Sequence, residues 1–356
     1  MEQNPIQLAQ IIEQGGLSCP NHGLMHGNVG MCIFFYHLAR KTNNPDYEKI
    51  AGDLLDKAFE NITPSAIADF ENGLAGIGWG IEYLVQNNFV EGETDEILGD
   101  VDDKIFRELS KNYNPTFELD NGLTGFLLYI IYRLKNKKGT LSMAQRINRE
   151  LFILTINKID EMVTAQFPTI VKEMKFDLFW RFPVMLYVLT EAFKLDIYND
   201  KIRCMIIQWQ RYFETYIPSL QINRLYLAVV LKKINSLLPD KCLEKQIQIL
   251  LFATNFEVLK TEVDHYAINI RFGWPGVALL LNLAIKELTA DLQNYQLISQ
   301  SLHAINEMHK NLLEKLPHDF TDESYKQYGL SSGLSGIGLI ELLWPGIISG
   351  ECIPFF

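Results

Sequence analysis

The stretch GLSSGLSGIG, residues 329–338, places glycines three residues apart at the point where an apolar run begins. The same arrangement occurs in MHGNVG (25–30), ENGLAGIG (71–78), DNGLTG (120–125) and IRFGWPG (270–276). Residues at i and i+3 share one face of a helix, so each glycine pair predicts a helix start that another segment approaches closely. Recurrence of one such unit along a chain is typical of repeat architectures.

Two kinds of helix alternate between these motifs. Residues 45–62 place Tyr47, Ile50, Leu54, Ala58 and Phe59 along one stripe with charges opposite, which predicts an amphipathic helix. Residues 94–113 and 291–316 show the same pattern. The segments 73–85, 122–134, 273–285 and 333–344 are apolar almost all round, which predicts helices that are buried on every side.

The spacing of the apolar helices predicts seven repeats. The first two steps between glycine starts are 46 and 49 residues, and the gap from 122 to 273 has room for two more repeats without glycines. The end repeats are as apolar as the middle ones, so an open stack would expose them, whereas a closed ring has no ends. We therefore predict an all-α fold, an α/α toroid with an inner and an outer ring of helices, as one domain over residues 1–356. The predicted inner-helix starts are Gly27, Gly73, Gly122, Phe182, Arg224, Gly273 and Gly333.

In such a toroid the inner helices converge at one mouth, and the glycines would allow that close approach. Asn72, Asn121 and Ser332 immediately precede glycines and are predicted N-caps. Pro275 is predicted at a helix start, where its missing N–H is tolerated.

Composition limits the function further. The 356 residues are 48% apolar and 21% charged, as in a globular protein, and the net charge of -11 argues against a nucleic-acid partner. No uncharged apolar run reaches the length of a membrane span, and the first residues lack the pattern of a signal peptide, so a cytoplasmic protein is predicted. Five cysteines without a CxxC pair indicate neither a disulfide framework nor a zinc ribbon.

The motifs FGWPG and SSGLSG, with the other glycine motifs in order, resemble the lanthionine synthetase C-like family, the lantibiotic cyclases, over essentially the whole chain. The resemblance implies a double-layered α/α barrel of seven helical hairpins. It also implies thioether ring closure in a precursor peptide, in which a cysteine thiol bound to zinc adds to a dehydrated serine or threonine. A zinc-bound thiol is deprotonated near neutral pH. The expected partners are a precursor peptide and other peptide-maturation enzymes.

This sequence departs from the family at the metal. Arg271 stands at the cysteine of the family motif Trp-Cys-Tyr-Gly-x-Pro-Gly, and Ser331 and Ser332 stand at the Cys-His pair of Cys-His-Gly-x-x-Gly. Arginine has no free lone pair, and neutral hydroxyls are poor zinc ligands. We therefore predict no cofactor and a lost zinc site, in a peptide-binding or divergent member of the family. A zinc cyclase with relocated ligands stays open, and CPNHGLMH offers Cys19, His22 and His26.

The remaining candidates lie near the predicted mouth. Glu71 and Asp120 either stabilise helix dipoles or form a carboxylate pair for a different chemistry, such as glycan hydrolysis. Arg271 is expected to pair with one of these acids or with the loop before Gly333, and Trp274 either packs in the core or contacts substrate. The catalytic candidates are His26, Glu71, Asp120 and His265, and the substrate-binding candidates are Asn72, Asn121, Arg271, Trp274, Ser331 and Ser332.

Overall fold

The computed structural model is helical throughout the part of the chain that it describes. That part comprises residues 3–60, 62–63, 65–111, 116–135, 141–173, 175–259, 261–263, 269–288, 292–313 and 325–349, and no strand occurs in it. The helices are α1 (Gln3–Gly15), α2 (Asn28–Thr42), α3 (Pro45–Phe59), α4 (Leu74–Gln86), α5 (Thr94–Ile97), α6 (Gly99–Ser110), α7 (Leu123–Leu134), α8 (Met143–Ile170), α9 (Arg181–Phe193), α10 (Asn199–Phe213), α11 (Gln221–Leu237), α12 (Lys241–Phe252), α13 (Phe256–Leu259), α14 (Trp274–Leu288), α15 (Leu292–Leu313), the 3₁₀ helix η1 (Tyr325–Tyr328) and α16 (Leu334–Ser349).

The chain divides into two compact units. Unit 1 comprises residues 1–159 and 317–356, and unit 2 comprises residues 160–316, so the boundary falls within α8. A single domain over residues 1–356 is predicted from the sequence, and this remains a prediction.

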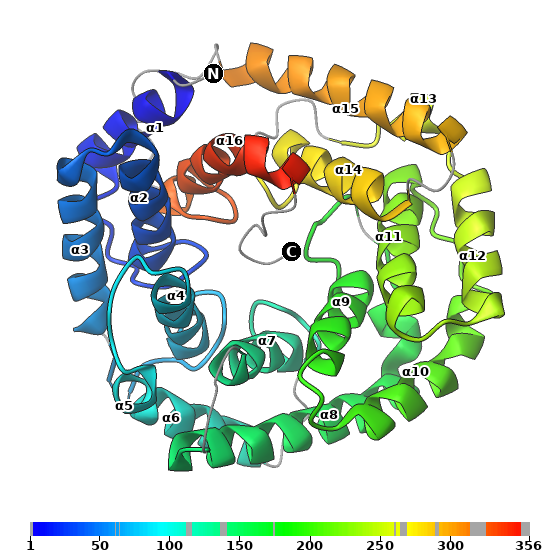
Figure 1. Cartoon of the computed structure of the whole chain (residues 1–356), viewed down its shortest axis with the longest axis horizontal. Coiled ribbons are helices and arrows are strands. Elements are labelled where there is room, and N and C mark those ends of the chain that lie inside the picture. The colour runs from blue at the N-terminus through cyan, green and yellow to red at the C-terminus, as the bar shows by residue number, and fades with distance from the viewer. Residues whose placement is uncertain are drawn as a thin grey trace. The chain divides into compact units, whose positions relative to one another are not determined.

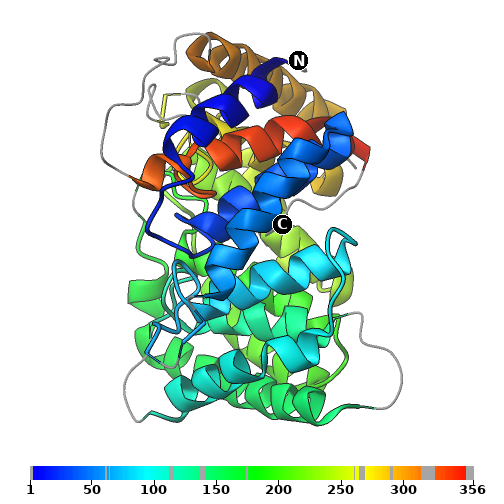
Figure 2. The ribbon, with the colours of Figure 1, turned by 90° about the vertical axis from the view of Figure 1, so that its left-hand side faces the viewer.

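In unit 1 the apolar helices form one layer. Helix α2 packs between α16 and α4, and α7 packs on the other side of α4 (Figures 1 and 2). The amphipathic helices lie behind this layer, with α1 on α16, α3 on α2 and α6 on α4. Helices from both ends of the chain therefore pack together, as the closed-ring prediction requires.

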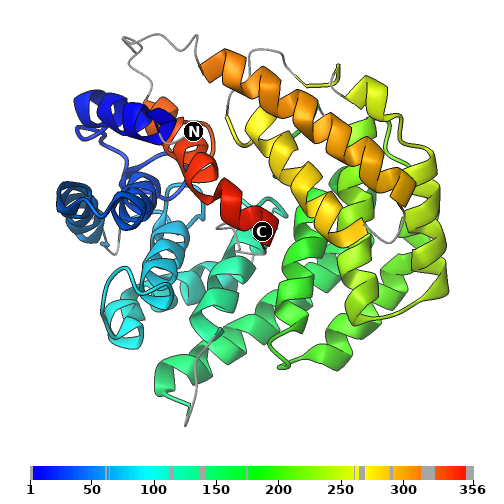
Figure 3. The same cartoon turned by 45° about the horizontal axis from the view of Figure 1, so that its top comes forward.

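Unit 2 repeats the arrangement. Helix α11 lies between α9 and α14. The amphipathic helices pack behind this layer, with α10 against α9, α12 against α11 and α15 along α14 (Figure 3). Across the described residues, every long apolar helix follows an amphipathic one, which confirms the predicted alternation. The apolar helices α2, α4, α7, α14 and α16 each begin one residue after the predicted glycine, while α9 begins at Arg181 and α11 at Gln221.

The burial of the two helix types also follows the sequence pattern. In α4 every residue from Leu74 to Leu84 is buried, whereas α3 buries only Ala51, Leu54, Leu55 and Ala58. The stripe predicted for α3 is therefore buried only in part, because Tyr47, Ile50 and Phe59 keep some exposure. The single helix predicted over 94–113 is two helices, α5 and α6, which are separated at Leu98.

The motif glycines leave space for the main chain of loops. From the sequence we expected them to leave space for neighbouring inner helices instead. A Cβ on Gly76 would overlap the carbonyl oxygen of Phe70, and one on Gly276 would overlap that of Ile270, six residues earlier in each case. The loop before each helix therefore folds back against the first turn, and only glycine leaves space for its main chain.

The predicted side-chain N-caps are wrong for the same reason. The residues at the N-caps of α4 and α7 are Gly73 and Gly122, neither of which has a capping side chain. The free N–H groups instead donate to the folded-back loop: Leu74 N to Ile67 O at 2.9 Å and Leu123 N to Thr116 O at 2.9 Å. Asn72, Asn121 and Ser332 are thus free to make other contacts, whereas Pro275 does lie in the first turn of α14 as predicted.

The repeat of α11 lacks glycines and closes its helix start differently. Glu173, from the loop before α9, accepts from Leu220 N at 3.1 Å. Glu262, from the loop before α14, accepts from Gln221 N at 3.0 Å and Ile222 N at 3.1 Å. Two carboxylates from neighbouring repeats therefore take the place of the backbone carbonyls used elsewhere. Their negative charges interact favourably with the positive end of the helix dipole.

Candidate functional site

Four loops of unit 1 are joined by main-chain hydrogen bonds just before α16, α2, α4 and α7. Leu330 N donates to Met25 O at 2.8 Å, Met25 N donates to Glu71 O at 2.8 Å, and Glu71 N donates to Asp120 O at 2.9 Å. The motif starts of these four repeats are therefore neighbours, as the sequence analysis predicted. This row of loops, which we call the motif loops of unit 1, carries His26, Asn72, Asn121, Ser331 and Ser332 beside the two acids.

One side-chain contact among the motif loops joins a histidine and a carboxylate of the first two repeats. His26 Nε2 lies 2.8 Å from Glu71 Oε1, with 4% of the histidine and 28% of the glutamate side chain exposed. The other ring nitrogen, Nδ1, is buried without a hydrogen-bond partner. A buried imidazole thus holds a partly exposed carboxylate in one orientation, and the sequence analysis had named both residues without predicting that they meet.

The other candidates of the motif loops contact their own neighbours. Asn72 Oδ1 accepts from Asn21 Nδ2 at 2.8 Å, and Asn121 Oδ1 accepts from Thr116 Oγ1 at 3.1 Å. Ser331 is buried, and its Oγ lies 3.3 Å from that of Ser332. Asn121 is exposed, whereas Asn72 and Ser332 are partly exposed, so these three side chains are accessible to a ligand.

The three side chains considered as a relocated zinc site point to separate partners. Cys19 Sγ is 3.8 Å from His26 O, His22 Nδ1 is 2.9 Å from Asn28 Nδ2, and His26 contacts Glu71. Within the described ranges no three residues of the types His, Cys, Asp or Glu are placed to hold a metal ion. Burial raises the pKa of the Cys19 thiol, which disfavours the thiolate that binds metals. His265, the remaining catalytic candidate, lies outside the described residues.

Arg271 has a partner that the sequence analysis missed. In unit 2 its Nε lies 3.0 Å from Asp177 Oδ1 and its Nη2 lies 3.1 Å from Asp177 Oδ2. The guanidinium also lies 5.1 Å from the ring centre of Phe179 and 4.9 Å from that of Phe272. The two loops are joined further by Leu178 N, which donates to Arg271 O at 2.8 Å. A bidentate ion pair between two rings fixes the arginine in place.

Trp274 is fully buried, with 0% of its surface exposed. Its ring is therefore packed within the core of unit 2. The burial agrees with packing in the core, and a role of Trp274 in substrate binding stays an untested prediction.

Asp69 is a structural residue of the motif loops that the sequence analysis also missed. Its Oδ1 accepts from Asn72 N and Gly73 N, both at 2.8 Å, and burial raises the pKa of this carboxyl. Asn269 holds the corresponding loop before α14, since its Oδ1 accepts from Phe272 N at 2.8 Å. An Asp or Asn four residues before the motif glycine was the sequence signal for both.

Comparisons with known proteins agree with this architecture. Residues 20–171 match the family described as lanthionine synthetase C-like protein. A solved structure titled "Nisin cyclase" superposes with a TM-score of 0.61 at 14% identity, covering 96% of this chain and 93% of that one. No curated protein sequence matches the chain.

At this identity the likeness to nisin cyclase shows the fold alone, which is an α/α toroid, so the predicted fold class is confirmed. The family match over residues 20–171 and the shared fold both support the resemblance that the glycine motifs carry, so this prediction is confirmed. No helix in the described part of the chain is long and apolar enough to cross a bilayer.

Proposed function

We propose that this protein binds a peptide in a peptide-maturation pathway and does so without the zinc-dependent step of the cyclases it resembles. The family match and the fold shared with nisin cyclase support a peptide as the ligand. The motif loops of unit 1, with their accessible amide and hydroxyl groups, are the surface proposed to receive it.

The observation that carries the proposal is the state of Arg271. By the resemblance it stands at the position of a zinc-binding cysteine, and its guanidinium forms a bidentate pair with Asp177. A fixed cation at that position repels a metal dication. Ser331, at the second cysteine position, is buried with its hydroxyl beside that of Ser332, so neither supplies a thiolate or an imidazole. These residues do not fit a zinc ion.

The test of this proposal measures metal and peptide separately. Elemental analysis of the purified protein after mild dialysis should find far less than one zinc per chain. A peptide library displayed on phage, panned against the full chain, should yield sequences that bind as synthetic peptides by calorimetry. Substitution of Asn121→Arg should weaken that binding, whereas Asp200→Arg on the exposed face of α10 in unit 2 should not. Stoichiometric zinc, or peptides that bind both variants equally, would contradict the proposal.

A second candidate function is an enzyme with metal-independent chemistry, which the contact between His26 and Glu71 favours. A buried imidazole that orients a carboxylate is a common arrangement for proton transfer. Glycan hydrolysis by Glu71 with Asp120 belongs to this class, and a substrate screen of the wild type against Glu71→Gln and Asp120→Asn separates it from peptide binding alone. Activity that is lost in both variants would favour the enzyme.

A further inference from the structure

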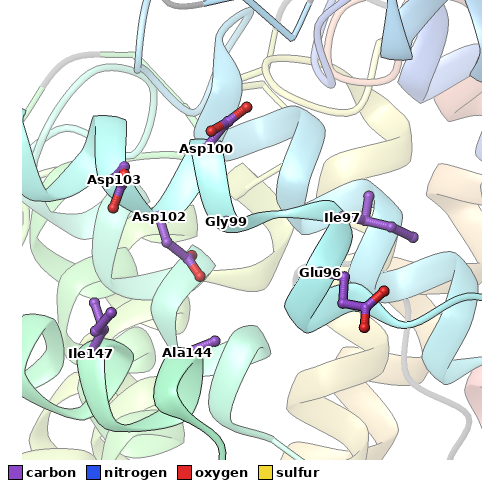
Figure 4. A pocket seen from close by; sticks show the side chains of 8 residues that line it. All are labelled: Glu96, Ile97, Gly99, Asp100, Asp102, Asp103, Ala144 and Ile147. Carbon is purple, nitrogen blue, oxygen red and sulfur yellow. The ribbon is translucent and has the colours of Figure 1, made fainter.

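Two cavities of similar size in unit 1 differ in the charge of their walls. One, of about 370 Å³, lies where α5, α6 and α8 come together, and its charged lining residues are all acids (Figure 4). The other, of about 360 Å³, is lined by the C-terminal part of α2, the first turn of α3 and the loop that follows α4. This second cavity carries charges of both signs, which belong to Arg40 and Glu48.

The positive charge at the second cavity belongs to a guanidinium that is only partly used. Arg40 Nη2 donates to Asn87 O at 2.8 Å and to Asn88 O at 2.9 Å. Its Cζ lies 3.5 Å from the ring centre of Phe89, so the guanidinium is held against the ring. Among the described residues Arg40 Nη1 has no hydrogen-bond or ion-pair partner. The cavity wall therefore presents a fixed cation whose remaining donors are available to an anionic group.

The negative charge belongs to Glu48 in the first turn of α3. This side chain is exposed, and it makes no hydrogen bond or ion pair within the part of the chain that the structure describes. In particular it does not pair with Arg40, although both residues line the same cavity. The two opposite charges therefore leave space between them for a ligand that carries the complementary charges.

A nearly buried tyrosine lines the same cavity and lacks a partner for its hydroxyl. Tyr36 is 7% exposed, and its ring packs against that of Phe89 with the ring centres 5.7 Å apart. Its hydroxyl forms no hydrogen bond with any described residue. Burial raises the pKa of Tyr36, and the nearby Glu48 carboxylate is among the smaller causes, so the hydroxyl keeps its proton. Because side-chain polar groups in buried surroundings normally have a partner, this hydroxyl points to a ligand that supplies one.

We propose that this cavity binds a free α-amino acid as its zwitterion. The carboxylate of the ligand accepts from Arg40 Nη1, while its ammonium group donates to the Glu48 carboxylate and to the Tyr36 hydroxyl. A ligand with a negative charge alone would face Glu48, and one with a positive charge alone would face Arg40, so neither is favoured. A longer peptide holds its two terminal charges apart, whereas an α-amino acid carries both groups on one carbon atom.

This site is separate from the peptide site proposed at the motif loops. The motif loops precede α2 and α4, whereas the cavity lies at the C-terminal ends of these two helices. The two proposals therefore stand or fall independently.

The first experiment follows thermal unfolding of the full chain with each of the common L-amino acids in millimolar excess, because a ligand that binds the folded state raises the melting temperature. The amino acid that raises it most is then titrated by calorimetry, beside its amide, which lacks the carboxylate, and its N-acetyl derivative, which lacks the ammonium group. The free amino acid should bind at least about tenfold more tightly than either derivative, because each derivative loses the charge-assisted hydrogen bonds of one group. An unchanged melting temperature with every amino acid, or a derivative that binds as tightly as the free amino acid, would overturn the proposal.

Two variants test whether the amino acid binds at this cavity, and each changes a group that has no hydrogen-bond partner among the described residues. Glu48→Gln should weaken binding by about tenfold, whereas the control Asp53→Asn, which removes one charge from an exposed position further along α3, should weaken it by less than about twofold. Tyr36→Phe keeps the ring and should weaken binding by about threefold or more, while the melting temperature of the protein without ligand stays unchanged. Equal effects of Glu48→Gln and Asp53→Asn would refute the site, as would a Tyr36→Phe variant that binds like the wild type or that melts at a lower temperature without ligand.

Discussion

Acid should destabilise the protein through His37, which α2 places against α4. Its Nε2 lies 2.7 Å from the hydroxyl of Tyr83, and burial, with the nearby charge of Arg40, lowers the pKa of the imidazole to about 4. In the unfolded chain the same group takes up its proton near pH 6.5. Between these two values the unfolded state binds a proton that the folded state does not, so stability falls as the pH falls. A difference of about 2.5 pKa units corresponds to about 3 kcal/mol of unfolding free energy, lost progressively from about pH 6.5 down to about pH 4.

The measurement is urea unfolding of the wild type and of His37→Gln at a series of pH values from 7 to 4. Glutamine keeps a polar group near Tyr83 and does not titrate, so the variant should lose about 3 kcal/mol less than the wild type over this range. Fluorescence follows the region directly, because the ring of Trp79 stacks on Tyr83 at 5.3 Å. Replacement of the exposed His303 by glutamine is the control and should leave the pH dependence unchanged. If His37→Gln and the wild type lose stability in parallel, the imidazole is protonated in the folded state and the reasoning is wrong.

Three further predictions concern stability and are read from thermal unfolding. Gly76→Ala should lower the free energy of unfolding by about 2 kcal/mol or more, because the new Cβ meets the loop carbonyl. Gly52→Ala, in the open middle of α3, should raise it by about 0.5–1 kcal/mol. A Gly76→Ala variant as stable as the wild type would disprove the folded-back loop as the reason for glycine. Asp177→Asn should cost about 1–3 kcal/mol because Arg271 loses its bidentate partner, and an unchanged melting temperature would show that the pair is not formed. Arg133→Met should cost about 3–5 kcal/mol because it leaves buried carboxylates uncompensated, and a smaller loss at pH 7 than at pH 4 would contradict this.

The repeats could be predicted from sequence because their signals are local. The apolar runs and the glycine pairs set the start of five helices to within one residue, and the count of seven followed from their spacing. The reason for the glycines could not be predicted, because a neighbouring helix and a folded-back loop place the same restriction on a Cβ. Only the structure shows that carbonyls such as that of Phe70 lie against the glycines.

The candidate site could be predicted only in part, because local sequence signals set which loops are neighbours but not which side chains meet. The motif loops are neighbours because consecutive repeats are neighbours, so His26 and Glu71 could be placed near one another. Their contact depends on side-chain directions that no periodicity encodes. The pair of Arg271 with Asp177 spans 94 residues of sequence, and nothing in the local pattern marks Asp177 as the acid that is chosen over others.

The packing of α1 and α2 against α16 has a consequence for synthesis on the ribosome. Unit 2 is one continuous segment, whereas unit 1 needs residues from both ends of the chain. While the protein is being translated, the faces of α1 and α2 that pack on α16 therefore wait for a partner that is made only after unit 2. We expect the later segment to reach its native packing first, the reverse of the usual order in which N-terminal parts fold first. A nascent chain stalled before Gly333 should accordingly protect residues 160–316 from protease while residues 3–42 are still cleaved.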